Sequence, residues 1–71
     1  MNFHAGDKFI DPNTDEVFHI QEMEEILVHP FKRAPFIMYS YFLQGTHGNE
    51  YELDHYELIN LLTDNTLIEE L

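Results

Sequence analysis

The chain lacks cysteine altogether and is nearly without positive charge. The absence of cysteine excludes a disulfide framework, a thiolate metal site and a thiol nucleophile. Three Lys and Arg residues stand against 14 Asp and Glu residues, which gives a formal net charge of -11 with every His neutral. A protein with this charge repels nucleic acid, so we expect no direct nucleic-acid binding.

Long hydrophobic runs are also missing. The longest one, Ala34 to Leu43, is interrupted by Ser40 and is much shorter than the ~20 apolar residues that span a bilayer. The N-terminal residues carry no basic, apolar signal sequence. We therefore expect no membrane association and a cytoplasmic location.

Hydrophobic residues nevertheless make up 44% of the chain and aromatic residues 14%, which is typical of a folded protein and not of a charged disordered tail. The length of 71 residues allows one small acidic domain, residues 1–71. A domain of this size buries only about 60% of the surface of its unfolded chain, which leaves little room for a deep catalytic cleft. We expect a protein that is not an enzyme.

Turn chemistry predicts a β-hairpin near the N-terminus. Asp7–Ile10 and Val17–Ile20 have the composition of strands, and Asp11–Asp15 between them has that of a turn. Pro12 presets the backbone at the first corner of this turn.

The second strand should continue to about Val28, with Glu22 and Glu24 on one face and Met23 on the other. The doublet Glu24–Glu25 breaks the alternation, so we predict a β-bulge or bend there. A helical turn across Gln21–Leu27 is the alternative, because Glu, Met and Leu are good helix formers.

Phe36–Leu43 is the clearest strand, and neither of its two alternating faces is polar. We assign the face of Met38 and Phe42 to the core. The opposite face then needs cover from a second copy, which predicts a homodimer interface made by Ile37, Tyr39 and Tyr41. A central strand in a closed barrel is the alternative.

A turn at Gly45–Asn49 leads to a short strand, Glu50–Leu53, and then to a helix. Asp54 and Glu57 have the spacing of a capping box, so the helix should start at Asp54 and end near Asp64–Asn65. The last residues, Thr66 to Leu71, form a final strand or a frayed end.

The predicted fold is therefore mainly β (α+β): a small curved antiparallel sheet or SH3-like barrel with one short C-terminal helix. The order of elements resembles that of small SH3-like modules. The core should consist of the apolar side chains of these elements: Phe9, Phe18, Ile20, Met38, Phe42, Leu53, Leu58, Leu61 and Leu62.

No sequence motif indicates catalysis or a bound cofactor. The five histidines, His4, His19, His29, His47 and His55, lack the short spacings of metal ligands, so we expect no metal site. No Ser-His-Asp arrangement and no Gly-rich phosphate loop is present in the sequence.

The distribution of charge is the most informative feature. Residues 1–29 hold seven acids and one base, residues 30–49 hold two bases and no acid, and residues 50–71 hold seven acids and no base. Acidic residues at alternate positions of a strand form a row with a spacing of ~6.6 Å. We predict that six of them form a partner-binding surface: Glu22, Glu24, Glu50, Glu52, Asp54 and Glu57.

In size, charge, aromatic content and lack of cysteine, the chain resembles small acidic bacteriophage-encoded DNA-mimic inhibitors. This resemblance implies a stoichiometric inhibitor, often dimeric, in the host cytoplasm. It would occupy the basic DNA-binding surface of a host protein such as a nucleoid protein, a sliding clamp or a nuclease. The alternative is a small SH3-like protein-interaction module without DNA mimicry, which would recognise its partner through Phe36–Leu43.

Overall fold

The computed structural model describes residues 2–70 and is mainly β, with 48% of residues in strands. The elements in chain order are β1 (Lys8–Ile10), β2 (Val17–Val28), β3 (Phe36–Gly45), β4 (Glu50–Asp54), α1 (His55–Thr63) and β5 (Ile68–Glu70).

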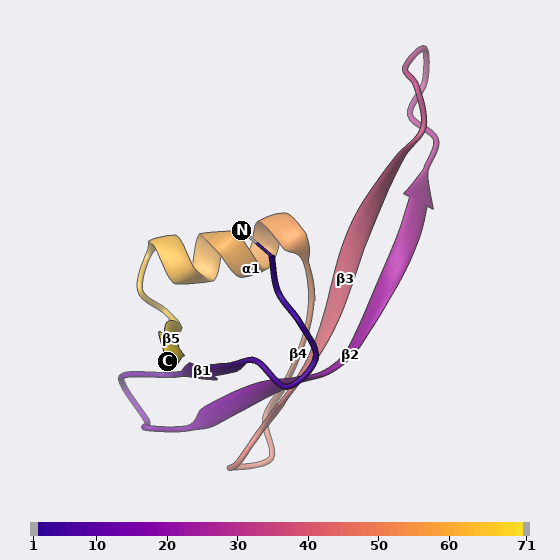
Figure 1. Ribbon diagram of the computed structural model, residues 1–71. Helices are drawn as coiled ribbons and strands as arrows, with labels where there is room; N and C mark the ends of the chain where they lie inside the picture. Colours follow the sequence, from indigo (N-terminus) through magenta and orange to yellow (C-terminus); the bar gives the residue numbers. More distant parts are fainter. Residues whose placement is uncertain (1, 71) are drawn as a thin grey trace.

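The five strands form one antiparallel sheet in the order β4-β3-β2-β1-β5, curled into a half-barrel (Figure 1). Because β4 and β5 lie at opposite ends of this order, the sheet is open and not a closed barrel. The mainly β class with one short C-terminal helix is confirmed. The helical alternative for Gln21–Leu27 is wrong, since this segment belongs to β2 and pairs with β3.

A β-bulge interrupts β2, but not where the sequence predicted it. Ile20 pairs with Leu43 and Glu22 pairs with Phe42, so Gln21 is the extra residue in the ladder. The prediction of a bulge is confirmed and its position at Glu24–Glu25 is wrong. The bulge keeps Ile20 on the core face and turns Glu22 to the opposite face, although the two are only two positions apart.

The core contains nine buried hydrophobic side chains from all parts of the fold: Phe3, Phe9, Phe18, Ile20, Tyr41, Leu43, Leu53, Leu58 and Leu67. β3 contributes Tyr41 and Leu43, so the prediction of Met38 and Phe42 as core residues is wrong. The cause is the register: Leu43 lies opposite Ile20, and Tyr41 lies opposite Leu53.

Helix α1 has the predicted boundaries. Asp54 is the N-cap and forms the capping box with Glu57, and Asn65 has the left-handed conformation expected after the helix end (φ 62°). Leu58 buries the helix against the sheet, and Leu67 then returns the chain to the core. The predicted final strand is β5; Leu71 lies outside the described residues.

The distal halves of β2 and β3 project from the body as a two-stranded arm (Figure 1). β4 pairs only with Ser40 to Gln44 of β3, so residues 36–39 pair with β2 alone. The arm comprises residues 23–39, including the loop at its tip. It accounts for the elongated shape of the molecule, whose principal extents are 44 × 22 × 20 Å.

Deleting Gln21 should leave the protein folded, because the deletion removes only the bulge. Ile20 and Glu22 then become consecutive residues of a regular ladder, and each keeps its present face. The matched control is deletion of the exposed His19, which makes Phe18 and Ile20 consecutive and forces one of these two buried side chains out of the core. Urea denaturation should show a cooperative transition for the first variant and a free energy of unfolding lower by about 2 kcal/mol or more for the second. An unfolded Gln21 deletion variant would contradict this account of the register.

Candidate acidic binding face

Five of the six predicted binding residues lie together on the sheet face opposite the core. Register places Glu22 and Glu52 on either side of Phe42, and Glu24 and Asp54 on either side of Ser40. Glu50 follows on β4 and pairs with Gln44. We call this surface the acidic face: Glu22, Glu24, Glu50, Glu52 and Asp54, with Ser40 and Phe42 between them.

The acidic face consists of two lines of carboxylates separated by an uncharged strand. Along β4 and along β2 the acidic residues repeat every ~6.6 Å, and the two lines lie two strand spacings apart, ~9.6 Å. Between them is a shallow hollow of about 120 Å³, lined by Glu22, Glu24, Ser40, Phe42 and Glu52.

No Lys or Arg among the described residues, 2–70, forms an ion pair with the acidic face. Within residues 2–70, the ion pairs join His4 to Asp7 and His47 to Glu16, and none involves Lys or Arg. Four of the five carboxylates are exposed and Asp54 is half-buried. The acidic face therefore projects an uncompensated negative field into the solvent.

Glu57, the sixth predicted residue, lies on α1 and reaches the acidic face through the capping box. The backbone N–H of Glu57 donates to Asp54 Oδ1 at 2.8 Å, and the backbone N–H of Asp54 donates to Glu57 Oε1 at 3.0 Å. Both carboxylates thus stabilise the helix start while they add to the negative surface.

The residues predicted for a dimer interface share one face of β3 but differ in burial. Tyr41 is only 2% exposed and belongs to the core, whereas Ile37 is 55% exposed and Tyr39 is half-buried. The Tyr41 hydroxyl and His55 Nδ1 share a hydrogen bond of 2.9 Å. Burial, and to a smaller extent Tyr39, raises the pKa of Tyr41, so its hydroxyl is protonated at neutral pH. The homodimer itself stays a prediction.

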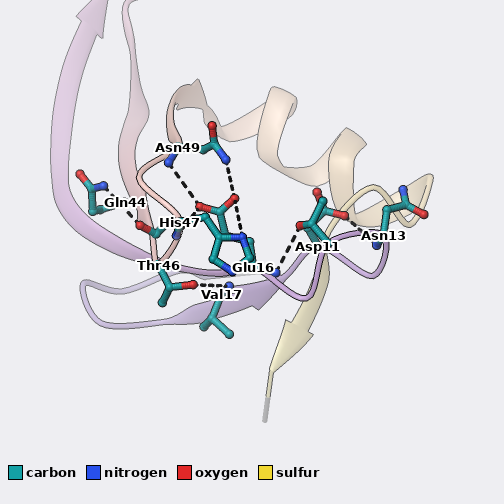
Figure 2. A network of polar contacts seen from close by, with 10 residues as sticks. Asp11, Asn13, Glu16, Val17, Gln44, Thr46, His47 and Asn49 are labelled. Carbon is teal, nitrogen blue, oxygen red and sulfur yellow. Dashed lines mark hydrogen bonds and ion pairs between the residues drawn. The ribbon is translucent and has the colours of Figure 1, made fainter.

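Sequence reasoning missed Glu16, which is the one buried charged residue in the part of the chain that the structure describes. Its carboxylate accepts hydrogen bonds from His47 N at 2.9 Å, from Asn49 N at 3.3 Å and from Asn49 Nδ2 at 2.6 Å (Figure 2). The donors belong to the turn between β3 and β4, so Glu16 holds the turn that leads into the acidic face. An acid directly before a strand carries no sequence signal of burial.

The same hydrogen bonds set the protonation of Glu16. Desolvation raises the pKa of the carboxyl, but the bonds from Asn49 and His47 together outweigh it, and its pKa lies below the ordinary value. With every oxygen occupied by the turn, Glu16 acts as a structural anion, and a role as general acid or base has no support here.

Gly45 is required where the Glu16 carboxylate packs on the backbone of β3. A Cβ at this position would collide with the carboxylate and would lie 2.7 Å from a ring carbon of Phe18. Gly48, by contrast, serves the turn through its positive φ of 91°.

The histidines do not converge. In residues 2–70 no three His, Asp or Glu side chains are placed to hold a metal ion. His19 is exposed. His55 packs against Phe3 and Tyr41, with ring centroids 5.6 and 6.1 Å apart. Among the same residues no helix is long and apolar enough to cross a membrane.

Gly45→Ala should lower the free energy of unfolding by about 1 to 3 kcal/mol, because the added methyl group displaces Glu16 or Phe18. Urea denaturation at neutral pH measures the change. A variant as stable as the wild type would show that the carboxylate is not held against this strand.

Glu16→Gln should destabilise the protein at neutral pH, and the deficit should shrink in acid. Because the folded pKa of Glu16 is lowered, its contribution is complete above the unfolded value of about 4.3 and is lost as the pH falls through the folded value. Urea denaturation of both proteins at pH 7 and pH 3 tests this. A deficit that stays constant over this range would contradict the assignment of Glu16 as a stabilising anion.

Comparison of the chain with models of protein families, with curated proteins and with solved structures gives no match.

Proposed function

We propose that the protein is a binding protein whose acidic face occupies the nucleic-acid-binding surface of a basic protein. The observation that carries the proposal is the placement of Glu22, Glu24, Glu50, Glu52 and Asp54 on one face, where none of them forms an ion pair with a Lys or Arg of residues 2–70. Acids needed only for solubility have no reason to gather in this way, and net charges of about 2 to 8 suffice for that purpose in a small domain.

The geometry of the acidic face supports competition with a nucleic acid. The ~9.6 Å between its two lines of carboxylates is intermediate between the widths of the minor and major grooves of B-DNA, ~6 and ~12 Å. A basic channel that accommodates two phosphate backbones therefore has cationic side chains at a comparable separation. The net charge of -11 also favours fast, steered association with such a channel.

Phe42 gives the acidic face a contact that DNA does not offer. It lies half-buried between Glu22 and Glu52, so its ring can pack against the aliphatic stem of a partner's Lys or Arg. This contact would make binding less dependent on salt than the binding of DNA, whose affinity depends on the release of condensed counterions. The proposed setting is a bacteriophage product that inhibits a DNA-binding protein in the host cytoplasm.

A second candidate is a protein-interaction module that binds through its arm. Six of the eight large hydrophobic side chains that are exposed in residues 2–70 lie between Met23 and Ile37. Such a concentration is typical of an interface. This candidate requires no DNA-binding partner.

Reversing two charges of the acidic face should abolish competition with DNA. Glu22→Lys with Glu52→Lys places like charges against a basic channel and should weaken binding by ~100-fold or more. The matched control is Glu69→Lys with Glu70→Lys, which changes the net charge equally on exposed positions of β5. The control should retain most of the binding.

The measurement is a pull-down from bacterial lysate with the wild type and both variants, followed by DNA competition with the captured protein. A capture by the wild type and the control, but not by the acidic-face variant, of a protein that DNA displaces supports the proposal. Equal loss with both variants would show that overall charge and not the acidic face is recognised. Capture of proteins that bind no nucleic acid would favour the interaction module.

A further inference from the structure

A groove lies in the elbow between the arm and the body, on the core side of the sheet. It has a volume of about 560 Å³ and is lined mainly by the N-terminal segment, the arm and the first turn of α1. Its apolar and aromatic lining includes Phe3, Met23, Ile37, Tyr39, His55 and Tyr56. Figure 1 shows the N-terminal segment and α1 on one side of this elbow and the rising arm on the other.

The arm itself presents an uncovered, largely apolar surface on the same side, on which the exposed Glu25 lies opposite Tyr39. Leu27 pairs with Ile37, and by alternation this pair shares the face of Tyr39 and Tyr41. Leu27 is 58% exposed and Ile37 is 55% exposed, so the two side chains lie against solvent. The elbow groove and the arm therefore form one continuous surface that needs a partner.

Charge is distributed along the molecule with opposite signs at the two ends of this surface. The loop at the arm tip carries Lys32 and Arg33, and residues 30–49 contain no acid. All 14 acids lie outside that segment, together with a single base, Lys8. The arm tip is thus positive and the body is strongly negative.

We infer that the occupant of this surface is a second copy of the chain, with the arm of each copy laid in the elbow groove of the other. A two-fold arrangement brings each positive tip to the negative body of its partner and places the Leu27–Ile37 pairs against apolar groove lining. The charge of an acidic partner would be complementary only to the arm tip, and that of a basic partner only to the body. A second copy supplies both signs at the required ends.

This dimer leaves the acidic face open. The face of Glu22 and Glu52 is opposite to that of Leu27 and Ile37 in the β2–β3 ladder, so the groove can be filled without covering the carboxylates. The dimer would present two acidic faces, and its existence does not depend on the proposed binding of a basic protein.

The test uses two double variants that change opposite faces of the arm. Leu27→Glu with Ile37→Glu alters the groove side, and Ile26→Glu with Val28→Glu alters two positions of β2 on the other side, neither of which lines the groove. Sedimentation of the wild type at micromolar concentration should give twice the chain mass of 8.5 kDa. The first variant should raise the dimer dissociation constant by ~100-fold or more, because it buries charge in an apolar contact, and the second by less than about 10-fold. Circular dichroism and urea denaturation establish that both variants are folded.

Charge provides an independent readout. Lys32→Glu with Arg33→Glu should weaken the dimer, and added salt should weaken the wild-type dimer in the same direction. A wild type that stays at 8.5 kDa on concentrating overturns the inference. Capture of a different protein through Leu27 and Ile37 would then identify another occupant. Stronger disruption by the Ile26 and Val28 variant, or a dimer unaffected by tip reversal, also overturns this arrangement.

Discussion

One extra residue in β2 decides which side chains reach each surface of this protein. If Gln21 were paired as in a regular strand, Ile20 and Glu22 would point the same way, because strand side chains alternate with a period of two. With the bulge, Ile20 packs in the core while Glu22 joins Glu52 on the opposite face. The acidic face and the groove side of the arm both depend on this shift.

The fold stabilises the negative charge of its buried carboxylate but leaves the carboxylates of the acidic face to repel one another. Glu16 is buried and receives three hydrogen bonds from the turn before β4, which stabilises its charge. The acidic face instead leaves its carboxylates unpaired, and each pair of charges ~6.6 Å apart repels by ~0.6 kcal/mol even in water. Repulsion of this kind opposes folding, and a basic partner that covers the acidic face would relieve it.

Features governed by neighbouring residues could be predicted, and features governed by distant residues could not. The capping box of Asp54 and Glu57, the left-handed Asn65 and the N-terminal hairpin agree with the sequence reading. Both alternating sets of β3 are apolar, so the pattern gave no physical basis for choosing the face of Tyr41 as the core. Phe3 belongs to the core, but no periodic pattern of apolar residues around it predicts its burial.

The sequence by itself determined the strand and helix segments, the charge of each segment and the alternation of Glu50 and Glu52, because these follow from short-range chemistry. Only the tertiary structure decided that β2 and β4 flank β3 with their acids on one face. The physical reason is register: a shift of one residue exchanges the two faces of a strand, and the bulge that sets this shift is fixed by packing between strands far apart in the chain.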